Sequence, residues 1–205
     1  MQPPHLLLFL FLPLLLPGMW ADPEAEPQVL QVLLTSLFDS ISSVEMSGVA
    51  FLGDTSIFTL DPTNWNIRFH WPWASQAASQ GDAEKLMAEY KIFLRNMIRF
   101  VHSTVQEAKE DYPLVIQLRV GCVLYPNKTS WGFMDVGEGG RDLAAFNVER
   151  QRWETHQSST LAELVTKSLN GQKSVLIFLE ELVAKFCPSQ ILNLHTCGRT
   201  ALERQ

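Results

Sequence analysis

Residues 82–108 read DAEKLMAEYKIFLRNMIRFVHSTVQEA, and this stretch decides the fold class. Its apolar side chains recur every three or four residues, which places them on one face of a helix. They are Leu86, Tyr90, Phe93, Met97, Phe100, Val101 and Val105. Charged residues occupy the other face, and Asp82 is a good candidate for the N-cap. The stretch therefore predicts a long amphipathic helix.

Strand patterns surround this helix on both sides. Short apolar runs separated by Gly, Asp, Pro and Asn are typical of strands joined by hairpin turns. Before the helix the runs are 29–34, 49–52, 57–60 and 65–69, and after Pro113 they are 115–125, 131–136, 143–148 and 150–153. Each group of four candidate strands precedes a helical segment.

A second helical segment begins at Thr160, where Glu163 stands at the spacing of a capping box. Asn170-Gly171 should interrupt it, and Pro188 should break it again. The chain thus contains two halves of about 85–95 residues, each with strands followed by a helix. This order predicts an α+β fold in which one antiparallel sheet carries both helices on one face.

The N-terminus has the features of an export signal. Leu6–Leu16 is apolar apart from Pro13, too short to span a membrane, and is followed by small residues that favour cleavage after Ala21. We expect a signal peptide over 1–21 and one domain over 22–205, with halves of about 22–110 and 111–205. No immunoglobulin-like domain or transmembrane segment is expected within these residues. In an exported chain, the sequon at Asn127 favours a glycan on a surface loop.

Composition narrows the classes of function. The 205 residues are 46% hydrophobic and 19% charged with a net charge of −6, and they contain no basic run, which argues against a nucleic-acid partner. No catalytic motif is present, and the histidines and cysteines have no metal-binding spacing. We therefore expect no enzyme, no metal and no cofactor. Cys122, Cys187 and Cys197 predict one disulfide and one spare thiol, with the pairing open.

Several motifs resemble the cluster of differentiation 1 glycoproteins, the lipid-presenting branch of the MHC class I-like family. In the second half these are Lys109–Pro113, Gly121-Cys122 and Tyr125-Pro126 followed by the sequon. The remaining similar motifs are Phe51–Asp54, Ile67–Trp73, Phe186–Pro188 and Leu202–Gln205. They occur in order and with similar spacing over nearly the whole chain that follows the signal.

The resemblance implies an eight-stranded antiparallel sheet under two long helices, with a deep apolar groove for lipid or lipopeptide tails. It also implies a Cys122–Cys187 disulfide, with Cys197 spare and the rival Cys122–Cys197 pairing left open. Presentation at the external face of the plasma membrane or in the extracellular space, with endosomal recycling left open, would involve T-cell receptors. Association with beta-2-microglobulin, which the family also makes through an immunoglobulin-like domain, is left open.

We expect the groove to be lined by apolar residues from both helices. The candidates are Tyr90, Phe93, Met97, Phe100, Val101, Leu164, Leu169, Val175, Leu176 and Leu179. Met97, Ile98, Gln172 and Val175 stand where glycolipid-presenting members have acidic and hydroxyl residues. The headgroup would therefore meet a different rim, formed by Asn96, Arg99, Gln172 and Lys173.

Two alternatives to lipid presentation remain open. A peptide-presenting relative would need several tyrosines to hold the peptide termini, and this chain has three. In a receptor-like member the two helices would close on each other and leave no space for a small ligand. Periodicity cannot decide between an open groove and a closed one.

Overall fold

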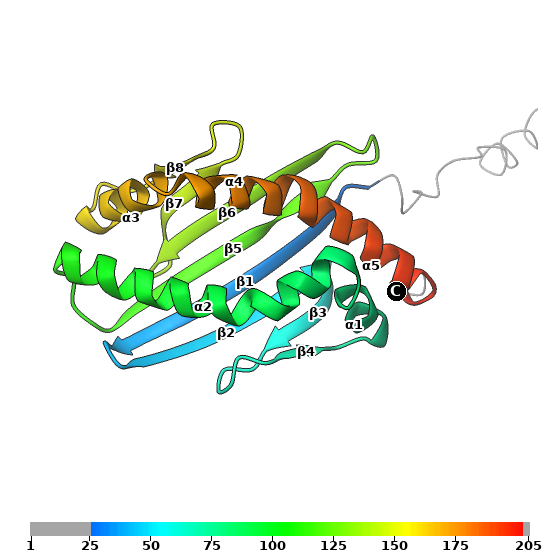
Figure 1. Cartoon of the computed structure of the whole chain (residues 1–205), viewed down its shortest axis with the longest axis horizontal. Coiled ribbons are helices and arrows are strands. Elements are labelled where there is room, and N and C mark those ends of the chain that lie inside the picture. Colours follow the sequence, from blue (N-terminus) through cyan, green and yellow to red (C-terminus); the bar gives the residue numbers. More distant parts are fainter. Residues whose placement is uncertain (1–25, 203–205) are drawn as a thin grey trace, which may run out of the picture.

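The computed structural model describes residues 26–202, in which eight antiparallel strands form one sheet and the helices cover one of its faces (Figure 1). The strand order is β4-β3-β2-β1-β5-β6-β7-β8, so the two halves of the chain meet where β1 pairs with β5. The predicted fold class is confirmed. The predicted signal peptide lies outside the described residues.

In each half of the chain, two longer strands are followed by two shorter ones. They are β1 (Gln28–Ser40), β2 (Ser43–Leu52), β3 (Thr55–Leu60), β4 (Ile67–Phe69), β5 (Leu114–Leu124), β6 (Ser130–Glu138), β7 (Arg141–Asn147) and β8 (Arg152–Thr155). The helical elements are α1 (Pro72–Ala78), α2 (Gly81–Ala108), α3 (Thr160–Asn170), α4 (Lys173–Glu181), a π-helical turn η3 (Leu182–Phe186) and α5 (Cys187–Leu202).

The sheet buries one face under the helices. In the second part of β1, Leu34, Ser36 and Phe38 are buried, whereas the residues between them are exposed. This period of two is what a strand shows when only one of its faces is covered. The helix-facing residues of the sheet form the floor on which α2 and the segment α3–α5 lie.

The second helical segment begins at Thr160 as predicted, but neither helix has the predicted residue at its N-cap. Asp82 lies in the first turn of α2, where its carboxylate pairs with Lys85 Nζ at 3.1 Å, and the N-cap is Gln80. At α3 the Ser159 hydroxyl accepts a hydrogen bond from the Ala162 N–H, so Ser159 caps the helix and the Thr160–Glu163 capping box is wrong. Adjacent Ser and Thr residues offer the same cap chemistry, and only backbone geometry selects one.

Pro188 does not break the second helical segment, contrary to prediction. The residue follows η3, in which the backbone bonds to a carbonyl five residues back rather than four. A proline is costly in a helix because it cannot donate the bond to residue i−4 and its ring crowds that carbonyl. The π-helical turn relieves this conflict, and α5 continues to Leu202. The predicted interruption at Asn170-Gly171 is present between α3 and α4.

Two features between β3 and α2 differ from the sequence prediction. Strand β4 begins at Ile67, because Trp65 adopts a left-handed conformation with φ of 58° in the preceding turn. The short helix α1 follows directly, with Pro72 at its start. Proline suits this position because its fixed φ is helical and its missing N–H would be unpaired there.

The two largest clusters of buried hydrophobic residues in the described chain lie at the two ends of the helical layer. At one end α2 contacts α3 over a buried cluster that includes Phe38, Val105 and Leu161. At the other end α1 contacts α5 over a second cluster that includes Ala74 and Ile191. Figure 1 shows these contacts at opposite ends of the platform, with α2 and α4 facing each other between them.

Gly132 allows the second helical segment to lie directly on the sheet. A Cβ atom at this position would lie 2.6 Å from Val183 Cγ2 and 2.8 Å from the Val183 carbonyl oxygen. Val183 belongs to η3 and is completely buried. The contact therefore depends on the absence of a side chain in β6.

We predict that Gly132→Ala destabilises the protein by about 1–3 kcal/mol, because the added methyl group must displace buried backbone and side-chain atoms. Gly171→Ala is the matched control, since its Cβ would meet its nearest neighbours at 3.4 and 3.5 Å. Urea unfolding of both variants measures the difference. Equal stability of Gly132→Ala and wild type would contradict the proposed close contact.

Candidate functional site

Two apolar cavities lie between α2 and the second helical segment, with the sheet as their floor. Cavity 1 has a volume of about 320 Å³ and cavity 2 of about 420 Å³. Cavity 1 lies under the C-terminal half of α2 together with α3 and α4, and cavity 2 lies under the N-terminal half of α2 together with α4, η3 and the first residue of α5. The helices are therefore held apart, and the closed-groove alternative does not describe this structure.

The polar groups in the wall of cavity 1 are few. The Thr104 hydroxyl donates to the Phe100 carbonyl at 2.8 Å, so it offers no free donor to the cavity. The indole N–H of Trp153 is buried without a partner within the part of the chain that the structure describes. Asn96 and Gln172 complete the polar lining. Such a wall favours an aliphatic occupant over a charged one, because a buried charge without a partner is costly.

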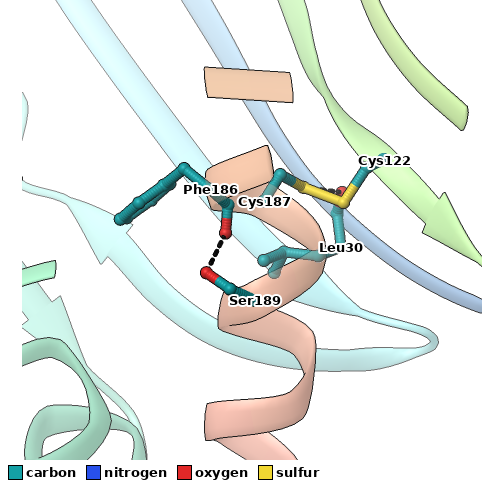
Figure 2. The surroundings of a disulfide bond; sticks show 5 residues. All are labelled: Leu30, Cys122, Phe186, Cys187 and Ser189. Carbon is teal, nitrogen blue, oxygen red and sulfur yellow. Dashed lines mark hydrogen bonds between the residues drawn. A yellow bond between two sulfur atoms is a disulfide. The ribbon is translucent and has the colours of Figure 1, made fainter. Parts of the chain in front are cut away.

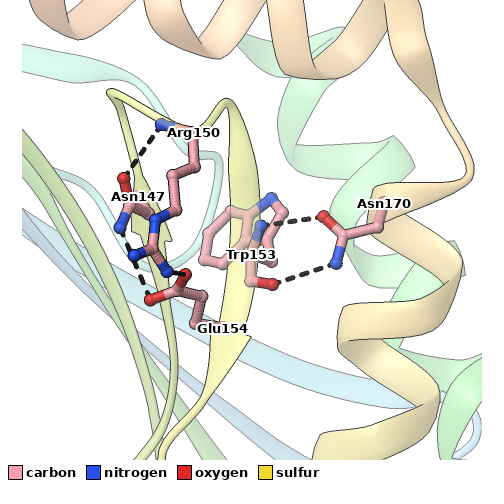
Figure 3. A network of polar contacts seen from close by, with 5 residues as sticks. All are labelled: Asn147, Arg150, Trp153, Glu154 and Asn170. Atoms are coloured by element: carbon pink, nitrogen blue, oxygen red, sulfur yellow. Dashed lines mark hydrogen bonds and ion pairs between the residues drawn. The ribbon is translucent and has the colours of Figure 1, made fainter.

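Trp153 is held in the wall of cavity 1 by the end of α3. The side chain of Asn170 accepts from the Trp153 backbone N–H at 2.8 Å and donates to its carbonyl at 2.9 Å (Figure 3). Arg150 also pairs with Glu154 at 3.2 Å beside it. These contacts fix β8 at the edge of the sheet against α3, although β8 has only four residues.

Most of the predicted groove residues line one or both cavities. Those lining cavity 1 are Phe93, Met97, Phe100, Val101, Leu169, Val175 and Leu179, and those lining cavity 2 are Tyr90 and Phe93. Leu164 and Leu176 line neither cavity. Leu176 packs against the cluster of Phe146, Trp153 and Leu179, and Leu164 lies beside the buried face of α3.

Other lining residues were not predicted from the helical periodicity. The floor comes from the sheet, with Ile116, Leu118 and Met134 in cavity 1 and Leu30, Val32 and Leu118 among the residues of cavity 2. Their alternation along the strands is visible in the sequence, but it does not distinguish a groove floor from an ordinary core. Phe178 was also missed, because it lies outside the main apolar stripe of its helix.

The predicted headgroup rim is only partly at the cavities. Asn96 lines both cavities and Gln172 lines cavity 1. Arg99 and Lys173 line neither; both are exposed, and Arg99 Nη1 lies 3.5 Å from Asn96 Oδ1. Of the four predicted rim residues, the two that line a cavity are thus neutral amides, and cavity 2 is also lined by the polar residues Gln31, Glu89 and Tyr90.

The disulfide implied by the family resemblance is present. Cys122 of β5 is joined to Cys187 at the start of α5, with their Cα atoms 6.0 Å apart (Figure 2). Close by, the Ser189 hydroxyl donates to the Phe186 carbonyl at 2.7 Å. The disulfide closes a separation of 65 residues, which stabilises a fold by about 2–4 kcal/mol in the loop-entropy model. Cys197 is the free cysteine.

The sequon at Asn127 lies in the turn between β5 and β6. Asn127 is exposed, and its side-chain oxygen accepts hydrogen bonds from the Thr129 N–H at 3.0 Å and from the Thr129 hydroxyl at 2.6 Å. An enzyme that attaches a glycan could therefore reach this side chain.

Other kinds of site are not found in residues 26–202. Within this range, no group of three or more His, Cys, Asp or Glu side chains could hold a metal ion. No helix in the same range is both long and apolar enough to cross a bilayer.

Comparison with known proteins places this geometry in a family. The model of the MHC-I family domain matches residues 5–201. The chain belongs to the MHC class I family. It is 31% identical to pig T-cell surface glycoprotein CD1a, with 97% of this chain and 60% of that protein covered. It is 27% identical to antigen-presenting glycoprotein CD1d of the rabbit Sylvilagus floridanus, with 84% and 62% covered.

Solved structures agree with this family. Chicken CD1-2 with bound fatty acid superposes with a TM-score of 0.82 at 39% identity, covering 88% of this chain and 64% of that one. Chicken CD1-1 superposes with a TM-score of 0.79 at 26% identity, covering 87% and 66%. The resemblance to the cluster of differentiation 1 glycoproteins is confirmed. The chain spans about three fifths of the length of the curated relatives named above.

The relatives' names describe surface and antigen-presenting glycoproteins rather than enzymes.

Proposed function

We propose that this platform binds the acyl tails of a lipid or lipopeptide in its two cavities and presents the ligand to T-cell receptors. The observation that carries the proposal is the pair of apolar cavities between α2 and the second helical segment, with the sheet as their floor. The fatty acid bound by the similar chicken protein supports a ligand of this class.

Burial of methylene groups would supply the binding energy. Water has a molecular volume of about 30 Å³, and a methylene group is of similar size. A cavity of about 320 Å³ thus accommodates on the order of ten methylenes. Each contributes about 0.8 kcal/mol on leaving water, so one filled cavity contributes on the order of 8 kcal/mol before ordering costs. Tail binding then needs no directed polar contact.

The site favours lipid over peptide. A peptide carries polar backbone groups at every residue, and each would need a hydrogen-bond partner once buried. The polar groups lining cavity 1 are too few to provide these partners.

The proposal includes export of the chain through the secretory pathway to the cell surface or extracellular space. The exposed sequon at Asn127 and the disulfide both support export.

The test of lipid binding is native mass spectrometry of the chain secreted from animal cells. We predict co-purifying lipids with long acyl tails, and weaker binding of the ligand in Met97→Trp, whose larger side chain occupies part of cavity 1. Displacement of two methylenes should weaken binding about tenfold. Arg95→Trp is the matched control, because Arg95 is exposed on α2 and lines neither cavity. Elution of peptides, or of a chain without ligand, would contradict the proposal.

Beta-2-microglobulin is the second proposed partner, on the sheet face turned away from the helices. Successive residues of a strand face opposite sides of the sheet. Gly132 faces Val183 in the helical layer, so its neighbour Trp131 faces away from the helices. The Trp131 side chain is 56% exposed, and its ring lies 5.7 Å from that of Phe133. Val123 pairs with Trp131 across β5 and β6, and Val29 pairs with Val123. Exposed apolar patches of this kind mark protein interfaces.

We predict that Trp131→Ser weakens binding of beta-2-microglobulin more than tenfold, since a buried tryptophan is a frequent centre of interface energy. Surface plasmon resonance with the wild-type chain and the variant measures the change. Leu192→Ser serves as control, because Leu192 is 60% exposed but lies on α5. Equal affinities of wild type and Trp131→Ser would exclude this face as the binding surface.

A further inference from the structure

The tripeptide Ile-Phe-Leu occurs once in each of the two helices that face each other across the groove (Figure 1). It forms residues 92–94 of α2 and residues 177–179 of α4. Leu94 and Leu179 are buried in both copies. The other four side chains are exposed, and we call them the docking surface: Ile92 at 54%, Phe93 at 41%, Ile177 at 52% and Phe178 at 46%.

The isoleucine of each copy points away from the sheet. A helix turns by about 100° per residue, so a side chain two positions before another lies on nearly the opposite side. Leu94 and Leu179 belong to buried clusters that include residues of the sheet. Ile92 and Ile177 therefore face outward from the platform, one on each side of the groove.

The phenylalanines connect this outer surface with the cavities. Phe93 and Phe178 line the cavity walls although each is almost half exposed, and Ile92 also lines cavity 2. Apolar surface thus continues from the outside of both helices into the groove. Contiguous exposed apolar surface of this kind marks a site of interaction with a protein or a membrane.

The charges around the docking surface favour an anionic partner. Residues 89–99 and 173–185 carry five basic and three acidic side chains, in a chain whose net charge is −6. The basic residues are Lys91, Arg95, Arg99, Lys173 and Lys185, and the acidic residues are Glu89, Glu180 and Glu181.

Two of the three carboxylates are already engaged. Glu180 accepts a hydrogen bond from Gln151 Nε2 at 2.8 Å, and Glu181 pairs with Lys185 at 3.3 Å. Within residues 26–202, neither Arg95 nor Lys173 belongs to an ion pair, and Arg99 does not either. Uncompensated basic groups therefore flank the apolar side chains on both helices.

We propose that the docking surface inserts into the polar–apolar boundary of an anionic phospholipid bilayer, so that lipids pass directly between the membrane and the cavities. This proposal rests on the proposed function in lipid binding. Apolar side chains that enter this boundary and basic side chains at the level of the phosphates are the two contributions that hold a peripheral protein on a membrane. An acyl tail that moves along Phe93 or Phe178 keeps apolar contact and is not exposed to water over its whole length.

A second copy of the chain suits the docking surface less well than a membrane does. Two identical faces would bring the same basic excess opposite itself, and like charges across an interface oppose association. The T-cell receptor proposed above would contact this side of the platform after loading, so the two uses are successive.

The first experiment measures binding of the secreted chain to vesicles by flotation. The vesicles consist of phosphatidylcholine with or without phosphatidylserine. We predict binding to the vesicles that contain phosphatidylserine, and about tenfold weaker binding of Ile177→Asp, because an apolar side chain at the boundary is replaced by a charged one. Leu192→Asp is the matched control, since Leu192 is 60% exposed but lies on α5 and lines neither cavity.

The basic residues have a test of their own. Arg99→Gln/Lys173→Gln should weaken binding to the vesicles that contain phosphatidylserine by about fivefold for each charge removed. Added salt should have the same effect on the wild-type chain, because it screens exposed charges. Binding that does not depend on phosphatidylserine, charge or salt would overturn the assignment of an anionic membrane.

The second experiment separates docking from lipid binding. Ile177 lines neither cavity, so Ile177→Asp should retain the wild-type affinity for a fluorescent fatty acid supplied as monomers in solution. Transfer of a fluorescent phospholipid from vesicles to the same variant should be about tenfold slower than to the wild-type chain. Leu192→Asp should match the wild-type chain in both measurements.

The outcomes distinguish this proposal from the function on which it rests. A wild-type chain that binds monomeric fatty acid but no vesicles, or equal vesicle binding and transfer in Ile177→Asp and Leu192→Asp, would overturn membrane docking alone. A wild-type dimer in sedimentation velocity that Ile177→Asp abolishes would assign the docking surface to a second copy of the chain. Failure to take up lipid from either monomers or vesicles would instead overturn lipid binding itself.

Discussion

The helical layer is attached to the sheet at its ends, and this constraint determines what lies between. At one end α2 and α3 pack over the cluster around Phe38 and Val105, and at the other α1 and α5 pack over the cluster around Ala74 and Ile191. The disulfide from Cys122 to Cys187 fixes the second helical segment to β5 at the latter end. Because both helices are supported at the ends, the space between their middles need not be filled by their own side chains.

The close contact between Gly132 and Val183 also attaches the second helical segment to the sheet, and it lies beside the disulfide. Cys122 pairs with Gly132 in the register of β5 and β6, and Gly132 receives Val183 of the π-helical turn. The covalent bond and the close contact thus act on neighbouring points of the sheet. The segment from α3 to α5 is interrupted between α3 and α4 at Gly171 and contains the π-helical turn η3. Val183 of this turn lies on the sheet at Gly132. Cavities usually destabilise a protein because their walls lose packing contacts, and a ligand that fills them restores those contacts.

Much of the fold could be predicted from the sequence, because strands and amphipathic helices leave regular patterns. The period of α2 and the interruption at Asn170-Gly171 were visible directly. The N-caps at Gln80 and Ser159, the short helix after Trp71 and the π-helical turn before Pro188 were not, since they depend on local geometry in which neighbouring residues compete for the same role. Leu164 and Leu176 fit the helical stripe as well as Leu169 does, yet only a three-dimensional arrangement shows which leucine faces the cavity. The sequence likewise could not show whether the helices stand apart, because a groove wall and a core have the same composition.

The most direct test of an apolar groove held open for lipid is an experimental structure of the chain secreted from animal cells, refined without any ligand. Elongated density should extend from the space between Phe93 and Phe178 into one or both cavities, with α2 and α4 in their present positions. Helices that close onto Leu118 and leave no enclosed space would contradict the central claim, whatever the family of the protein.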